Sequence, residues 1–220
     1  MTILRSGKRR LASAVALASV AVIGTAAATS AQSSKPDEAR FQMFANPAQV
    51  NCLKASDNPH RQPTVDVTVD RGDENDTMTL HLRNFKPDLQ FDLFTVQNSN
   101  QTATGTPVTG FGNFGMAWYQ SDIHVSHGGT ATVRIKTILL DQIFGFDPGV
   151  GLNPTNTFHV GFWFNNPADA ANCGFTGFTP FNGEHHAGPL AFITRPDAQT
   201  NLGPLCTDPT TSNGTVSCNP

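Results

Sequence analysis

The sequence predicts an all-β fold, an antiparallel Greek-key β-sandwich of seven or eight strands with long loops. Three observations predict it: apolar and polar residues alternate in several short runs, turns rich in Gly, Pro, Asn and Asp separate these runs, and no long amphipathic helical pattern interrupts them. A closed barrel is the alternative. The chain has 220 residues, 38% hydrophobic and 14% charged, and a single β domain can absorb about 200 residues.

The first strands follow one another closely. The run TVDVTVD, residues 64–70, places three valines on one face and Asp, Thr and Asp on the other, which is the period of a half-buried strand. After the turn RGDEND, the run TMTLHLR repeats the pattern with Met78, Leu80 and Leu82 inward. We therefore expect two neighbouring strands. NFKPD then turns the chain into QFDLFTVQ, a third strand at residues 90–97.

The later strands are separated by longer connections. We expect a short strand and turn in SDIHVSHGG, a strand with regular alternation in TATVRIKT, and the last strand in GPLAFITR. TFHVGFWFN, residues 157–165, is apolar on nearly both faces, which places it centrally in the sheet. ILLDQIFGF favours a single helical or 3₁₀ segment. Residues 98–113 and 165–187 are expected to be long loops, where binding residues are often found.

One passage resembles a known family of sandwiches. The residues LHLRNFKPDLQFDLFTVQ, 80–97, are similar to the strand, Pro-Asp turn and aromatic strand of fibronectin type III and related immunoglobulin-like domains. The resemblance covers under a tenth of the chain. It implies an immunoglobulin-like arrangement of the predicted sandwich.

The N-terminus has the three parts of a secretory signal: basic MTILRSGKRR, an apolar segment of about 14 residues, and the small-residue exit TAAATSAQSS. We expect cleavage after Ala28 or Ala31 and a secreted or extracytoplasmic protein with no membrane span. Removal of residues 1–31 takes away four cations and no acid, so the formal net charge falls from −3 to −7. Such an acidic chain is not expected to bind nucleic acid.

Four parts are expected: the signal peptide 1–31, an N-terminal lead 32–63, the β-sandwich domain 64–195, and an irregular, disulfide-stapled tail 196–220. All four cysteines lie after the signal, and an even count in an exported chain favours two disulfides. Three connectivities are possible. We favour Cys52 with Cys173 and Cys206 with Cys218.

Five of the seven histidines fall between residues 124 and 186, which is the one feature typical of a metal site. Neutral imidazole is a good ligand for zinc or copper. The candidate ligand set is His159, Glu184, His185 and His186. Its spacing matches no compact ligand motif, so solvated or hydrogen-bonded histidines without a cofactor are the alternative.

A segment that contains these residues, FHVGFWFNNPADAANCGFTGFTPFNGEHHAGPL, residues 158–190, resembles copper-zinc superoxide dismutase, itself a Greek-key sandwich. The order of the copper-ligand strand, disulfide loop and zinc loop is similar. The resemblance implies that His159 is the first copper ligand, Cys173 the loop cysteine, and His185 or His186 a later loop histidine.

The same segment departs from that family at its ligand positions. Gly161 stands where the second histidine of the family's His-Val-His would be, no histidine follows Pro180 at the bridging position, and Pro189 replaces an expected aspartate. The resemblance therefore implies a topology and no redox activity.

Trp118, Tyr119 and Trp163 are candidates for an aromatic platform that binds a sugar ring or a peptide, with burial in a Phe-rich core as the alternative. No complete catalytic constellation is evident, so enzymatic activity is left unassigned. The sequence favours a secreted, non-catalytic module that binds a polysaccharide or protein through its long loops. The alternative functions are an extracytoplasmic copper or zinc protein with an incomplete copper site, and a structural coat component.

Overall fold

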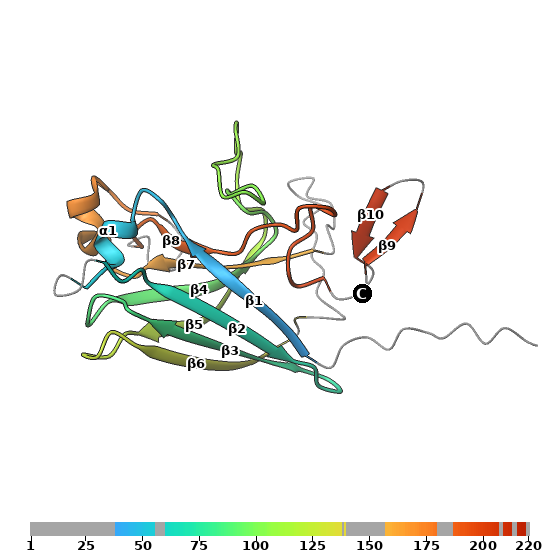
Figure 1. Cartoon of the computed structure of the whole chain (residues 1–220), viewed down its shortest axis with the longest axis horizontal. Coiled ribbons are helices and arrows are strands. Elements are labelled where there is room, and N and C mark those ends of the chain that lie inside the picture. Colours follow the sequence, from blue (N-terminus) through green and yellow to red (C-terminus); the bar gives the residue numbers. More distant parts are fainter. Residues whose placement is uncertain are drawn as a thin grey trace, which may run out of the picture. The chain divides into compact units, whose positions relative to one another are not determined.

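Antiparallel strands make up most of the computed structural model, which describes residues 38–55, 60–137, 139, 157–179, 187–206, 209–212 and 215–218. The all-β class is confirmed: eight strands form one antiparallel sheet, and two more form a hairpin (Figure 1). The strands are β1 Glu38–Ala45, β2 Thr64–Asp70, β3 Asp76–Arg83, β4 Gln90–Val96, β5 Ala117–His124, β6 Ala131–Thr137, β7 His159–Phe164, β8 Leu190–Ile193, β9 Pro209–Ser212 and β10 Thr215–Cys218.

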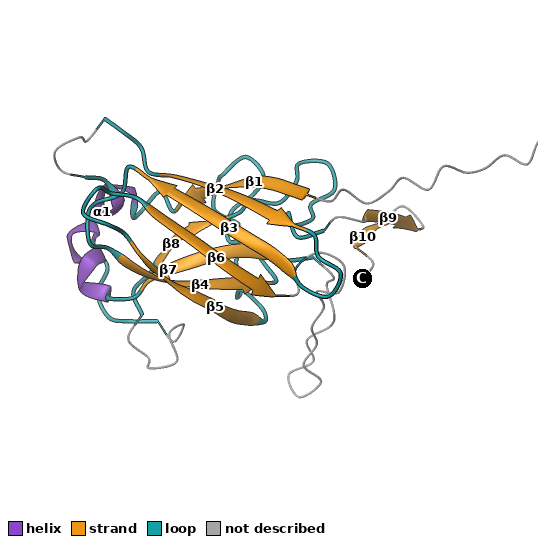
Figure 2. Ribbon diagram, turned by 90° about the horizontal axis from the view of Figure 1, so that it is seen from below, coloured by secondary structure: helices purple, strands orange, loops and turns teal. Residues whose placement is uncertain are grey.

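The eight strands follow the order β5-β4-β7-β8-β1-β2-β3-β6, so β5 and β6 are the edges of the sheet. The sheet curls until these two edge strands come into contact. Strands β3 and β6 consequently cross the half that contains β4 and β7 (Figure 2). The result is a nearly closed, barrel-like sheet that surrounds the main core.

β1 changes its partner along its length. Residues 38–43 pair with β2, whereas Phe44 and Ala45 pair with β8. A strand that switches partner in this way makes a corner between two parts of a sheet. These residues fall in the expected N-terminal lead 32–63, yet Ala39, Phe41 and Met43 alternate with polar residues and turn toward the main core.

The alternating runs form the strands that were predicted from them. β2 spans residues 64–70, and its three valines are buried. Met78, Leu80 and Leu82 of β3 are buried beside them, because β2 and β3 pair in register from Thr64 and Arg83 to Asp70 and Thr77. β4 and β6 also coincide with their predicted runs.

β7 is the central apolar strand that the sequence predicts. It lies between β4 and β8, and all six of its residues are buried. Two apolar clusters account for this burial. The main core takes one face, and a smaller cluster covers the other face; its members are Phe94, Val96, Trp163, Leu190 and Ile193, with Phe114 and Ala117 packed against them.

Two short helical segments lie at the same end of the sheet, joined by a disulfide. α1 spans Val50–Leu53, and the 3₁₀ helix η1 spans Pro167–Cys173 within the predicted loop 165–187. Cys52 and Cys173 form a disulfide with their Cα atoms 6.0 Å apart, which confirms this predicted pair. The bond ties the start of the sheet to the connection after β7.

The C-terminal region contains the short hairpin β9–β10, where the sequence analysis expected an irregular tail. Cys206 is disulfide-bonded, but the Cys218 side chain is not among those described, so the pair Cys206–Cys218 stays a prediction. The signal segment and most of ILLDQIFGF also lie outside the described residues. In the part of the chain that is described, no helix is long and apolar enough to span a membrane.

Candidate functional site

The three aromatic candidates do not share one face of the sheet. Tyr119 pairs with Phe94 and Trp118 with Thr95, so these neighbours on β5 point to opposite sides. Trp118 turns inward, and its ring lies 5.1 Å from that of Phe158. Trp163 points outward but is only 1% exposed. Of the three, Tyr119 alone has an exposed ring, at 53%.

Tyr119 and Trp163 instead belong to one line of rings on the outer face, with Phe94 between them. The ring of Phe94 lies 5.7 Å from Tyr119 and 5.5 Å from Trp163, and both contacts are edge-to-face. The line continues from Trp163 to Phe114 at 5.1 Å and to Phe111 at 4.8 Å. The 97–116 connection thus packs its two phenylalanines over the outer face of β7, which fixes the position of the loop.

A β-bulge brings a carboxylate to Tyr119. The register between β4 and β5 shifts so that Gln120 is an extra residue, which leaves Tyr119 and Asp122 on the same face. The Tyr119 hydroxyl donates to Asp122 Oδ1 over 2.8 Å. Desolvation together with this carboxylate raises the pKa of Tyr119 to about 12. The phenol is therefore a neutral donor at physiological pH.

His159, the first member of the predicted metal set, is buried at the start of β7. Its Nδ1 lies 3.1 Å from Thr194 Oγ1. Burial lowers the pKa of His159 to about 4, so the imidazole is neutral. Glu184, His185 and His186 are outside the described residues, and within the described ranges no three His, Cys, Asp or Glu side chains gather as a metal site would require. The copper or zinc site stays a prediction.

A polar groove of about 700 Å³ lies beside the predicted loop 98–113, and we call it the amide groove. One wall is the loop 97–113, and the other includes Thr157, His159, Pro196 and Asn201. The loop projects from the sheet next to β1 and the residues that follow β8 (Figure 1). Five side-chain amides line the groove: Gln97, Asn98, Gln101, Asn113 and Asn201.

Several of these groups hold the loop itself in shape. Asn98 Nδ2 donates to the carbonyl of Asn113 over 3.3 Å, and Gln97 Oε1 accepts from the Met116 backbone N–H over 2.8 Å. Ser99 Oγ donates to the Thr194 carbonyl over 2.8 Å. In contrast, no described residue forms a hydrogen bond with the side-chain amide of Asn201, whose backbone N–H donates to the Asp197 carbonyl. The groove therefore combines a fixed wall with amide groups available to a ligand.

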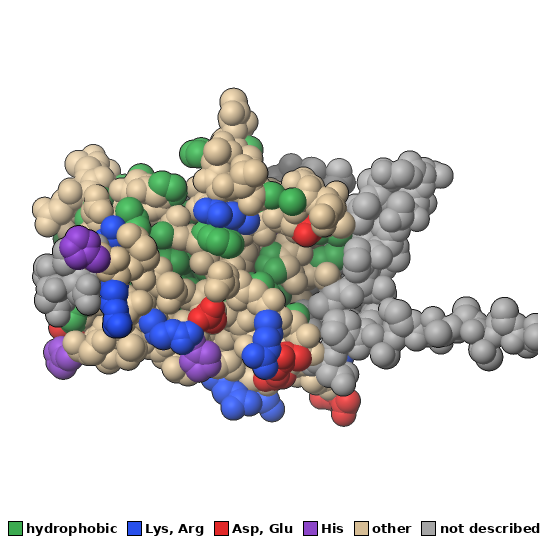
Figure 3. All heavy atoms as spheres, in the orientation of Figure 1, with side chains coloured by type: hydrophobic (Ala, Val, Ile, Leu, Met, Phe, Trp, Pro, Cys, Tyr) green, Lys and Arg blue, Asp and Glu red, His purple; other side chains and the backbone are tan. Residues whose placement is uncertain are grey.

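The lining is uncharged as well as polar. None of the described residues around the amide groove is Asp, Glu, Lys or Arg. Besides the amides, the lining includes the half-exposed ring of Phe111 and the hydroxyls of Ser99 and Thr102, which also form hydrogen bonds within the loop and to Thr194. Charged side chains gather elsewhere, over β2, β3 and β6 on the face drawn in Figure 3. The site can donate and accept hydrogen bonds and stack a ring face, and it gives a charged ligand no partner.

The sequence indicated the loop but not these residues. The run of Asn, Thr, Gly and Pro from residue 98 marked an unusually long connection, and its amides are the groups that line the groove. No pattern in the sequence indicates Asn201 as a site residue, because it belongs to the segment that was expected to be an irregular tail.

Comparison of the chain with models of protein families, with curated proteins and with solved structures finds no match in any of the three.

Proposed function

We propose that this chain is an exported, non-catalytic module that binds a neutral, hydroxyl-rich ligand, a polysaccharide, in the amide groove. The observation that carries the proposal is the composition of the groove: amides, hydroxyls and one aromatic ring, with no charged residue among the described residues that line it.

Carbohydrate hydroxyls both donate and accept hydrogen bonds, and a side-chain amide offers the same pair of roles in one group. The ring of Phe111 provides an apolar surface for a sugar face, in the way that aromatic side chains line many ligand pockets. The neutral His159 adds an imidazole without adding charge. Contacts such as that between Asn98 and Asn113 order the loop before binding, which lowers the entropy cost of association.

The strand order supports an immunoglobulin-like sandwich as the architecture of this module. With β1 set aside, one half of the sheet is β2-β3-β6 and the other is β5-β4-β7-β8. Named in chain order from A, these are A-B-E and C′-C-F-G, the arrangement of fibronectin type III domains. We infer that β1 is an additional strand that bridges the two layers, and that the amide groove lies beside the C–C′ connection.

Export is the third part of the proposal. Its support is the basic, apolar and small-residue order of the first 31 residues, together with the Cys52–Cys173 disulfide, since such bonds persist in oxidising compartments. Fractionation of the native host tests it: the chain is expected outside the cytoplasm and shortened at its N-terminus.

A matched pair of variants tests the groove. Asn201 and Asn84 both have a left-handed backbone, with φ of 59° and 62°, so glycine is tolerated at either position without backbone strain. Asn201→Gly removes an amide from the groove, whereas Asn84→Gly removes one on another part of the sheet. We expect a panel of neutral polysaccharides, measured by calorimetry, to contain a ligand whose affinity falls about tenfold in N201G and is unchanged in N84G.

Two results would contradict this proposal. One is a panel in which only anionic polysaccharides bind. The other is a neutral ligand with the same affinity for N201G as for N84G.

A further inference from the structure

Among the described strands, none pairs with one edge of β1 over most of its length. β8 pairs with Phe44 and Ala45 only, and the chain then leaves the sheet at Thr194. Residues 38–43 pair with β2 on one side and with no described strand on the other. The open edge is about 20 Å long, at roughly 3.3 Å for each of its six residues.

The direction of the backbone groups along this edge follows from the pairing with β8. The backbone N–H of Asn46 donates to the Ala191 carbonyl over 2.8 Å, so Asn46 faces β8. Because backbone groups alternate along an antiparallel strand, those of Gln42 and Arg40 point to the same side. These N–H and C=O groups are a template for a further strand.

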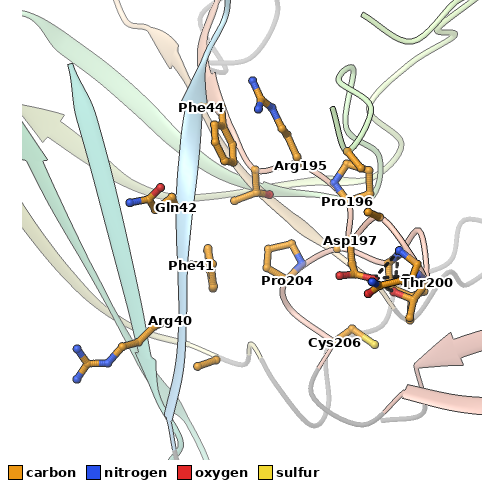
Figure 4. Close-up of a pocket in the computed structure, with 17 residues that line it drawn as sticks. Arg40, Phe41, Gln42, Phe44, Arg195, Pro196, Asp197, Thr200, Pro204 and Cys206 are labelled. Atoms are coloured by element: carbon orange, nitrogen blue, oxygen red, sulfur yellow. Dashed lines mark hydrogen bonds between the residues drawn. The ribbon is translucent and has the colours of Figure 1, made fainter. Parts of the chain in front are cut away.

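The edge is open because a cavity lies beside it. This hollow, of about 670 Å³, separates β1 from the segment 194–206. We call it the edge groove. Phe41 and Pro204 face each other across it, and Asp197 and Cys206 border its far side (Figure 4). It shares only Pro196 with the amide groove, so the two hollows are separate sites.

The side chains next to the open edge differ between its two faces. Ala39, Phe41 and Met43 turn toward the core, whereas Glu38, Arg40 and Gln42 are on the outer face. A strand added here would place alternate side chains beside these two sets. The edge groove therefore favours a peptide in which apolar and polar residues alternate.

Arg195, at the end of the groove next to β8, forms an ion pair with none of the described carboxylates. Arg195 lies with its guanidinium carbon 3.8 Å from the centre of the Phe44 ring, and its Nε donates to Gln101 Oε1 over 2.9 Å. Figure 4 shows the guanidinium beside Phe44. Arg40, in contrast, already pairs with Glu38. A carboxylate on an incoming chain would meet Arg195 as its partner.

We propose that the edge groove binds an extended acidic peptide segment of a partner protein, which adds to the sheet as an antiparallel strand beside β1. The added strand continues along the path of β8 beyond Thr194, where the chain leaves the sheet. Its backbone pairs with Arg40 and Gln42, its alternate apolar side chains pack beside Phe41, and a carboxylate near its N-terminal end pairs with Arg195.

The first test uses the unaltered chain and defined synthetic peptides. The probe is acetyl-Glu-Val-Glu-Val-Glu-Val-amide with a fluorescent label, and anisotropy measures its affinity. Two further peptides carry N-methyl groups on all three glutamates or on all three valines. Strand addition uses every second amide of the peptide, so one methylated peptide is expected to lose at least tenfold in affinity while the other keeps binding. A fourth peptide has lysine in place of each glutamate of the probe. It is expected to bind more weakly than the probe, because it presents no carboxylate to Arg195.

A second test changes the edge. Gln42→Pro removes the N–H that faces the groove, while Gln42→Val keeps it; both lose the bond from Gln42 Nε2 to Asp66 Oδ1. We expect the probe to bind Gln42→Pro about tenfold more weakly than Gln42→Val.

Equal affinities of the two methylated peptides, or of the two Gln42 variants, would overturn the proposal. If Gln42→Pro does not fold, the methylated peptides decide the question on the unaltered chain. A dimer that forms through this edge and excludes the probe would also overturn it, since the occupant would then be a second copy. None of these outcomes bears on the amide groove.

Discussion

Arg195 donates from Nε to Gln101 Oε1 over 2.9 Å, and the same Gln101 side chain donates from Nε2 to the Ala45 carbonyl over 3.3 Å. Gln101 is 3% exposed. Through this one buried amide, the connection 97–116 is joined both to β1 and to the residue that leaves the sheet after β8. The wall of the amide groove and the end of the edge groove are therefore fixed by the same contact.

Replacement of Gln101 by alanine is expected to destabilise the chain by about 2 kcal/mol, because two partly buried hydrogen-bonding groups, Arg195 Nε and the Ala45 carbonyl, lose their partner. The loop should also become more sensitive to limited proteolysis. Urea unfolding and a protease time course measure the two effects. Gln90→Ala, at an exposed position of β4, is the control and should change neither. A Gln101→Ala chain as stable and as resistant as the control would refute this role.

Gly161 is required by the ring of Trp163. A Cβ at residue 161 would lie 3.1 Å from Cζ3 of Trp163 and 3.5 Å from Cγ1 of Ile193. The Ile193 distance is an ordinary contact, but the buried Trp163 ring would have to shift by a few tenths of an ångström. We expect Gly161→Ala to cost about 1–3 kcal/mol and to change the fluorescence of Trp163. Gly112→Ala, where a Cβ would meet nothing within 4 Å, should leave stability unchanged; similar losses in both variants would contradict this explanation.

The same contact explains a departure noted in the sequence. Gly161 stands where the copper-zinc superoxide dismutase pattern has a second histidine, and here the position is filled by the Trp163 ring. Periodicity places both residues in one strand on one face. It gives no sign that the aromatic side chain lies over the glycine, since that depends on the packing of the 97–116 loop.

Most of the sheet is predictable because its strands have one buried face. β2 reproduces the run 64–70, since Val65, Val67 and Val69 have a single way to be buried together. β1 has the same alternation in EARFQMFA but was assigned to the lead, because a short apolar run next to a polar segment looks like loop when its partners are unknown. Trp118 and Tyr119 are neighbours on β5 and point to opposite sides, as the period of a strand requires. The bulge at Gln120 places Tyr119 and Asp122 on one face, and no local pattern marks that bulge.

Ionisation of Tyr119 reports its contact with Asp122 directly, because it is the single tyrosine in the chain. A phenol that donates to a carboxylate resists losing its proton, and partial desolvation disfavours the phenolate as well. Absorbance titration is expected to show a pKa near 12. In Asp122→Asn the pKa should move toward 10, the usual value for tyrosine. A normal pKa in the unaltered chain would show that the hydrogen bond is absent in solution.

His159 makes stability depend on pH in a defined range. Its pKa is about 4 in the folded chain, against about 6.5 for an unfolded histidine. Between these values the unfolded chain binds a proton that the folded chain does not, so stability falls as pH is lowered from about 6.5 to about 4. The loss at the acid end of this range is roughly 3 kcal/mol, about 1.4 kcal/mol for each unit of pKa.

A variant separates this contribution from those of the acidic side chains. His159→Asn keeps a polar group near Thr194 but does not titrate, so its stability should be nearly flat between pH 6.5 and 4.5, even if it is lower throughout. Asp66, whose pKa is lowered by its hydrogen bond with Arg83, loses its contribution below its unfolded value of 3.8, outside this window. Urea midpoints at pH 7.0, 5.5 and 4.5 measure both chains. Parallel pH profiles for the two chains would show that the buried imidazole is not the group that makes stability depend on pH.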